Sequence, residues 1–242
     1  MDTIKILSDD VKMIAHRGVS GIEVENTIPS FLLAAKKSYY GIETDLHVTL
    51  DNKYIICHDD NIKRVTGIDK VIEETTFEEL RQIKVLNYGG LFVGDIYLPT
   101  LEEYINICKN SNKIAVLELK NEMKECCIKE IVDIITKLNY FPNTIFISFS
   151  KENIKHLRNN FADSNCQYLA IVDTDEKKED AINFAHRYKV NLDLYHNGIN
   201  SDFVNKCHKK GILINVWTVD DVNLAKKLID FGVDFITSNI LE

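Results

Sequence analysis

The 242-residue sequence contains little proline and glycine, with 3 and 10 residues respectively. This scarcity excludes collagen-like and low-complexity chains, which need far more of both residues. Hydrophobic residues make up 45% of the chain and charged residues 27%, which is the composition of a globular protein with a large core. The length suits one α/β barrel or two small domains equally well.

Long apolar runs and cysteine pairs are also missing. No segment reaches the length needed to span a bilayer, and the first 11 residues hold Asp2, Asp9 and Asp10 instead of the apolar run of a secretory signal. The six cysteines are scattered and form no CxxC pair, so we expect reduced residues that pack in the interior. These absences predict a cytoplasmic protein without membrane insertion.

The sequence has no excess of positive charge. Its net charge is −8 and its isoelectric point is about 5.4, so it lacks the broad positive field that nucleic-acid or membrane-surface binding requires. We therefore expect a small-molecule partner and no nucleic acid. An acidic protein that binds a phosphate needs a local cation or a focused arginine or lysine site. The composition does not indicate an oligomeric state.

What the sequence does contain is a regular alternation of short β-branched runs and helical patterns, typical of a parallel α/β fold. Eight runs are interpreted as strands, and that number favours closure into a barrel. The expected strands are 12–15, 41–50, 113–120, 143–149, 167–172, 190–195, 212–217 and 233–237. The expected helices are 29–38, 124–138, 151–160, 175–188, 202–210 and 222–231.

One region interrupts this alternation. Residues from about 59 to 99 are polar and turn-rich, with a helical signal only around 76–84, and they occupy the place of one strand-to-helix connection. A disordered loop is the alternative, but apolar residues such as Val65, Phe77 and Leu80 favour packing. We expect a small inserted subdomain.

The run 41–50 places Glu43, Asp45 and His47 on one face of a strand, because side chains alternate between faces. In a solvent-facing antiparallel strand two such acids would mean little. In a parallel strand both faces are usually covered, so two buried carboxylates need a cation or several donors. A metal ion would meet that need, while His47 is better interpreted as a structural residue.

Three further strand ends carry polar side chains. Glu118 and Lys120 end the run 113–120, His16 follows the run 12–15, and His58 follows an apolar run at 54–57. A single histidine in such a place is more often structural than catalytic. Their convergence at the carboxyl ends of barrel strands, where barrel active sites lie, favours function.

Eight short motifs extend over nearly the whole chain. They are His16-Arg17-Gly18, Glu25-Asn26-Thr27, Glu43-Thr-Asp45, His58-Asp59, Leu98-Pro-Thr-Leu-Glu-Glu103, Glu118-Leu-Lys120, Ser148-Phe149 and Asn215-Val-Trp217-Thr218. In these motifs and in their order the sequence resembles the glycerophosphodiester phosphodiesterase family.

The resemblance implies a single (β/α)₈ TIM barrel over residues 1–242, with a small insertion after the second strand. It also implies hydrolysis of glycerophosphodiesters, such as glycerophosphocholine or glycerophosphoethanolamine, to glycerol 3-phosphate and an alcohol. By resemblance, one divalent cation, Mg²⁺ or Ca²⁺, binds Glu43, Asp45 and Glu118; His16 and His58 are the catalytic pair; and Arg17 and Lys120 lie near the phosphate.

Phosphodiester cleavage needs charge neutralisation, an activated nucleophile and a protonated leaving group, and two histidines can supply the last two. Which histidine is the base and which the acid is left open, and Glu25, Asn26 or Asp59 could support them. Trp217 could line the pocket or cap the core, and for Phe149 core packing is slightly favoured.

Two rival functions remain. One is a barrel enzyme resembling phospholipases C or D that stops at a cyclic phosphate, and the other is an inactive barrel that serves as a binding protein. One departure from the family pattern is visible at 237–240, where Thr-Ser-Asn-Ile stands in place of Thr-Asp-x-Pro. We expect it to alter the closing loop and none of the catalytic positions.

Overall fold

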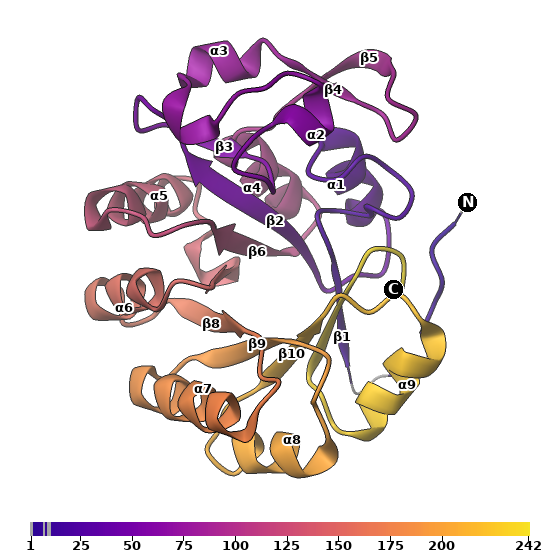
Figure 1. The fold of residues 1–242 in the computed structure, drawn as a ribbon, viewed down its shortest axis with the longest axis vertical. Coiled ribbons are helices and arrows are strands. Elements are labelled where there is room, and N and C mark those ends of the chain that lie inside the picture. Colours follow the sequence, from indigo (N-terminus) through magenta and orange to yellow (C-terminus); the bar gives the residue numbers. More distant parts are fainter. Residues whose placement is uncertain (1, 7, 9–10) are drawn as a thin grey trace.

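The computed structural model describes residues 2–6, 8 and 11–242, and over these residues eight parallel strands close into a barrel (Figure 1). The sheet order β1-β11-β10-β9-β8-β7-β6-β2 is completed by the pairing of β1 with β2. The barrel strands are β1 (Lys12–Ala15), β2 (Gly41–Val48), β6 (Ile114–Leu119), β7 (Thr144–Ser148), β8 (Asn165–Ala170), β9 (Asn191–Tyr195), β10 (Ile214–Trp217) and β11 (Phe235–Ser238). The predicted (β/α)₈ TIM barrel is confirmed.

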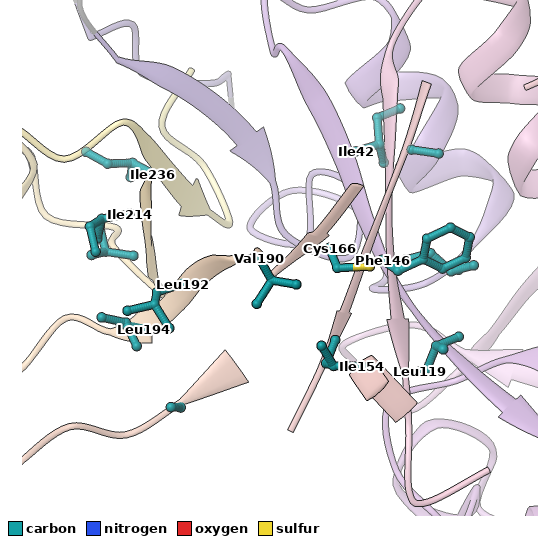
Figure 2. Close-up of a cluster of buried hydrophobic side chains, with 14 of the residues drawn as sticks. Ile42, Leu119, Phe146, Ile154, Cys166, Val190, Leu192, Leu194, Ile214 and Ile236 are labelled. Carbon is teal, nitrogen blue, oxygen red and sulfur yellow. The ribbon is translucent and has the colours of Figure 1, made fainter. Parts of the chain in front are cut away.

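Helices connect successive strands and cover the outside of the barrel, as Figure 1 shows. Apolar residues from the outer faces of the strands pack beneath them, including Ile42, Phe146, Leu192 and Ile214 (Figure 2). The helices are α1 (Ile28–Ala35), α4 (Leu101–Asn110), α5 (Glu125–Lys137), α6 (Lys151–Asn160), α7 (Asp175–Tyr188), α8 (Ser201–His208) and α9 (Val222–Asp230), with a 3₁₀ turn η2 (Phe141–Asn143) before β7.

Helix α4 was not among the expected helices, although its start carries a clear signal. The Thr100 side chain accepts from the Glu103 N–H, and the Glu103 carboxylate accepts from the Thr100 N–H, which forms a capping box. The Tyr104 hydroxyl then donates to the carbonyl oxygen of Ile42 at 2.6 Å, which ties α4 to β2. This buried bond supports the strand that carries two of the predicted metal ligands.

The expected break in the alternation contains short elements with a hydrophobic cluster of their own. The apolar run that ends at His58 forms strand β3 (Tyr54–Ile56), which pairs antiparallel with β2 and is not one of the eight parallel barrel strands. Beyond it the structure has α2 (Lys63–Thr66), η1 (Ile72–Glu74), α3 (Phe77–Arg81), β4 (Lys84–Leu86) and β5 (Phe92–Tyr97), which Figure 1 shows grouped beside β2 and β3. Ile62, Ile72 and Leu80 are fully buried in that cluster. The description of 59–99 as an inserted subdomain stays our interpretation.

The inward-facing side chains divide the barrel into an apolar floor and a polar rim. Ile14, Val116, Ile147 and Leu169 form a buried cluster in the interior. Toward the carboxyl ends of β1 and β6 the pocket-lining side chains become ionisable, because Ile14 is followed by His16 and Val116 by Glu118. This change from apolar to ionisable side chains places the site at that end of the barrel.

The six cysteines are free thiols, and five of them are buried, as expected of packing residues. Among the described helices, none is long and apolar enough to cross a membrane.

Candidate active site

Three carboxylates meet at the carboxyl ends of β2 and β6. Asp45 and Glu118 are direct neighbours in the register of the two parallel strands, and Glu43 lies two residues before Asp45 on the same face. One oxygen from each of the three carboxylates lies within 4.8 Å of the other two. The structure therefore brings Glu43, Asp45 and Glu118 together, as the sequence predicts.

The carboxylates are buried, with exposed fractions of 3% for Glu43, 1% for Asp45 and 8% for Glu118. Burial, followed by the charge of Asp45, raises the pKa of Glu43 well above its usual value and raises that of Glu118 to about 7. Asp45 behaves differently, because Lys120 and Arg17 outweigh the effect of burial and lower its pKa. The cluster therefore holds one firm anion and two carboxyl groups that ionise reluctantly without added positive charge.

Arg17 and Lys120 supply the positive charge beside this cluster. The Lys120 ammonium lies 2.9 Å from Glu118 Oε1 and 3.4 Å from Asp45 Oδ1, and Arg17 Nε lies 3.4 Å from Asp45 Oδ2. Asn26 donates to Asp45 Oδ2 at 2.7 Å, and the Arg17 backbone N–H donates to Glu43 at 2.8 Å. These donors hold the carboxylates in place.

The two predicted catalytic histidines have different partners. His16 Nδ1 lies 2.7 Å from the amide oxygen of Asn239, whereas His58 Nδ1 lies 2.7 Å from the carboxylate of Asp59. Burial and then the charge of Arg17 lower the pKa of His16 to about 4. His16 is therefore a neutral ring at neutral pH.

An ion-pair network that sequence reasoning missed joins the supporting residues. Arg64, from α2 in the 59–99 region, contacts Glu25 at 2.8 Å and Asp59 at 2.6 Å. Glu25 also contacts Arg17 at 3.0 Å. Arg64 lowers the pKa of Asp59 to about 2, although burial opposes this shift, so the partner of His58 stays ionised.

One pocket, with an empty volume of about 380 Å³, is lined by both histidines together with Arg17, Lys120, Glu43 and Glu118. Phe149 forms part of its wall at 48% exposure, so the slight preference for core packing of this residue was wrong. Its ring packs edge-on against Trp217, with centroids 5.8 Å apart. Trp217 also lines the pocket, which resolves the open choice for that residue.

Asp193 is a pocket residue that sequence reasoning did not identify. It lies on β9 between Leu192 and Leu194, which pack outward against the helices. Burial and the charge of Glu118 raise its pKa well above the usual value. The alternation of the Leu-Asp-Leu segment could have shown that this acid faces the barrel interior.

The closing loop after β11 also differs from expectation. We expected the departure at 237–240 to leave the catalytic positions unaffected, but Asn239 lies against His16. The His16 backbone N–H also donates to the Ser238 carbonyl at 2.8 Å, because β1 and β11 are neighbours in the barrel. The loop is therefore part of the site.

A (β/α)₈ barrel whose strand ends gather carboxylates, imidazoles and cationic side chains around one pocket has the fold and site of a barrel enzyme that acts on anionic substrates. The sequence profile of the glycerophosphoryl diester phosphodiesterase family matches residues 16–241. The chain belongs to this family, and it is a phosphoric diester hydrolase.

Individual relatives agree with this assignment. The chain is 25% identical over 230 residues to the glycerophosphodiester phosphodiesterase of Caldanaerobacter subterraneus, covering 94% of this chain and 93% of the relative. It is 30% identical to the glycerophosphodiester phosphodiesterase structure from Parabacteroides distasonis, with a TM-score of 0.79 and coverage of 96% and 94%. An Oleispira antarctica phosphodiesterase, solved with the product sn-glycerol-3-phosphate, matches with a TM-score of 0.84, 25% identity and coverage of 95% and 93%.

Proposed function

We propose that this enzyme hydrolyses glycerophosphodiesters, such as glycerophosphocholine or glycerophosphoethanolamine, to glycerol 3-phosphate and an alcohol, with His16 and His58 as the acid–base pair. The observation that carries this proposal is that both histidines line the same pocket as Glu43 and Glu118. The glycerol 3-phosphate bound in the Oleispira antarctica phosphodiesterase supports the choice of product.

The donor set of Glu43, Asp45 and Glu118 fits one hard divalent cation, Mg²⁺ or Ca²⁺. All three ligands are carboxylates, which these ions prefer, and their oxygens lie within 4.8 Å of one another. The raised pKa values of Glu43 and Glu118 indicate that the cluster needs more positive charge than Arg17 and Lys120 provide. When bound, such a cation would polarise the phosphoryl oxygens and neutralise their charge.

The partners of the two histidines support different roles for them. His16 is neutral at neutral pH and has an amide partner, so it is suited to accept a proton from the attacking hydroxyl or water. His58 Nδ1 lies 2.7 Å from the Asp59 carboxylate, which fixes the orientation of the ring, so His58 is suited to deliver a proton to the leaving alcohol. We assign His16 as the base and His58 as the acid.

The remaining pocket residues would position the substrate. Arg17 and Lys120 place cationic groups at the rim, where a phosphate would gain charge-assisted hydrogen bonds. Phe149 and Trp217 provide an apolar wall against which the carbon skeleton of the substrate would pack. No broad basic surface is required, in agreement with the net charge of −8.

Product analysis tests this proposal. The purified enzyme is incubated with glycerophosphocholine and Mg²⁺ or Ca²⁺, and products are followed by ³¹P NMR for the wild type, His16→Ala and His58→Ala. We expect glycerol 3-phosphate from the wild type and a loss of about 10²–10⁴-fold in either variant. A cyclic phosphate that persists would instead support the phospholipase-like alternative, and full activity in both variants would refute the acid–base assignment.

A further inference from the structure

A chain of hydrogen bonds reaches His16 from the loops that follow β10 and β11. His16 Nδ1 lies 2.7 Å from Asn239 Oδ1, and Asn239 Nδ2 donates to Asp220 Oδ2 at 2.6 Å. The Asn239 backbone N–H and the Ser238 hydroxyl donate to the other Asp220 oxygen at 2.8 and 2.9 Å. Because β1, β11 and β10 are consecutive in the barrel, the loops that follow these three strands lie side by side.

Asp220 determines which way the Asn239 amide points. An ionised carboxylate only accepts hydrogen bonds, so the NH₂ group of Asn239 has to face Asp220 and the amide oxygen has to face His16. The hydroxyl of Ser20 lies 2.5 Å from Asn239 Oδ1 and 2.7 Å from the His16 carbonyl oxygen, and its single proton can be donated to either one. A hydroxyl can donate or accept, so Ser20 is compatible with either amide orientation.

An amide oxygen facing Nδ1 accepts a hydrogen bond from the Nδ1–H group, which keeps the proton on Nδ1 and leaves Nε2 as the ring nitrogen with a free lone pair. We infer that Asp220 and Asn239 are positioning residues that hold neutral His16 in the tautomer with the proton on Nδ1, so that Nε2 is the basic atom offered to the pocket. Neither Asp220 nor Asn239 is among the residues that line the pocket, so both act through His16. Because the pKa of His16 is lowered, the ring is neutral at neutral pH, and a neutral ring exists as one of two tautomers.

The structure offers an isosteric way to reverse the amide. In Asp220→Asn, the new amide oxygen can still accept from the Asn239 backbone N–H and from Ser238, which turns its NH₂ group toward the Asn239 side chain. Two facing NH₂ groups repel, so the Asn239 amide rotates, presents its NH₂ to His16 Nδ1, and favours the proton on Nε2. Adding Asn239→Asp to this variant restores an acceptor for Nδ1 and a matched pair with residue 220.

The test compares four proteins: the wild type, Asp220→Asn, the double variant Asp220→Asn/Asn239→Asp, and Asp221→Asn as control. Asp221 lies next in the chain but caps α9 by accepting from the Leu224 N–H, a role that asparagine also performs. Long-range ¹H–¹⁵N NMR at neutral pH identifies which nitrogen of His16 carries the proton, with His16→Ala used to assign the signals. Thermal melts check that each protein is folded.

We expect the Nδ1–H tautomer in the wild type, the control and the double variant, and the Nε2–H tautomer in Asp220→Asn. For turnover of glycerophosphocholine, we expect Asp220→Asn to lower kcat about 100-fold with KM within about 3-fold, and the double variant to recover most of that loss. An unchanged tautomer in folded Asp220→Asn, or a double variant that is no more active than Asp220→Asn, would overturn the inference. The rate readout rests on the proposed function, but the tautomer does not, so absence of turnover in the wild type would count against the function alone.

Discussion

The carboxylate cluster predicts an unusual pH dependence of stability for the metal-free protein. The pKa of Glu118 rises from 4.5 to about 7 on folding, mainly because of burial and then because of the charge of Asp45. A carboxyl group with a raised pKa in the folded state contributes stability that is fully present below its unfolded pKa and is lost as the pH rises through its folded pKa. Between about pH 4.5 and 7 the metal-free protein should therefore lose stability at this residue.

The magnitude follows from the shift. Each pKa unit corresponds to about 1.4 kcal/mol, so the full shift amounts to on the order of 3 kcal/mol, of which about 2–3 kcal/mol falls between pH 5 and 8. Glu118→Gln replaces the carboxyl group with a neutral amide of the same shape and removes this dependence. His16, whose pKa is lowered to about 4, changes stability in the opposite direction, but it is present in both proteins and cancels in their difference.

Urea unfolding at pH 5 and pH 8 in EDTA measures the effect. We expect the wild type to lose about 2–3 kcal/mol more than Glu118→Gln between these two pH values. Glu102→Gln, a change at an exposed position on α4, is the matched control and should behave as the wild type. Identical pH dependence in the wild type and Glu118→Gln would refute the claim that Glu118 ionises reluctantly in the metal-free site.

Three further predictions concern the framework of the site. Asp59→Asn replaces the carboxylate that lies 2.7 Å from His58 Nδ1 and orients its ring, so kcat should fall about 10–100-fold; a steady-state kcat equal to that of the wild type would contradict this. Tyr104→Phe removes the buried hydrogen bonds from the Tyr104 hydroxyl to the carbonyls of Ile42 and Val116 and should cost about 1–2 kcal/mol in urea unfolding, while an unchanged midpoint would argue against the bond between α4 and β2. Gly18→Ala would place a Cβ 2.3 Å from the Ser30 hydroxyl oxygen at a φ of +76°, and we expect a loss of more than about 2 kcal/mol or an insoluble protein. Gly211→Ala is its control, because φ there is +72° but no atom lies within 4 Å of the new Cβ, so only the conformational cost of about 1 kcal/mol applies; equal losses in the two variants would contradict the steric account.

Much of the barrel could be predicted because its strands and helices carry local signals. The strand 41–50 alternates, and in a buried parallel strand this places Glu43 and Asp45 together on the inside. Pairing between β2 and β6 then brings Glu118 beside Asp45. The position of the carboxylate cluster thus followed from periodicity and strand order.

The contacts between loops could not be predicted in this way. Arg64 on α2 forms ion pairs with Glu25, in the segment between β1 and α1, and with Asp59. Asp220, in the loop after β10, accepts a hydrogen bond from Asn239, in the loop after β11. Such contacts depend on the three-dimensional course of the loops, which have no periodicity to read. The apolar run at 54–57 indicated a strand that ends at His58, but its three residues Tyr54–Ile56 could not show that it pairs antiparallel with β2.

The central claim is that turnover depends on a divalent cation held by Glu43, Asp45 and Glu118. The most direct test is the rate of glycerol 3-phosphate formation from glycerophosphocholine by chelator-treated enzyme as Mg²⁺ or Ca²⁺ is added back, for the wild type and for Asp45→Asn in parallel. The account predicts no turnover without a cation, saturable recovery in the wild type, and recovery in Asp45→Asn that is at least about 100-fold weaker. Wild-type turnover that persists in excess chelator, or equal recovery in the two proteins, would contradict it.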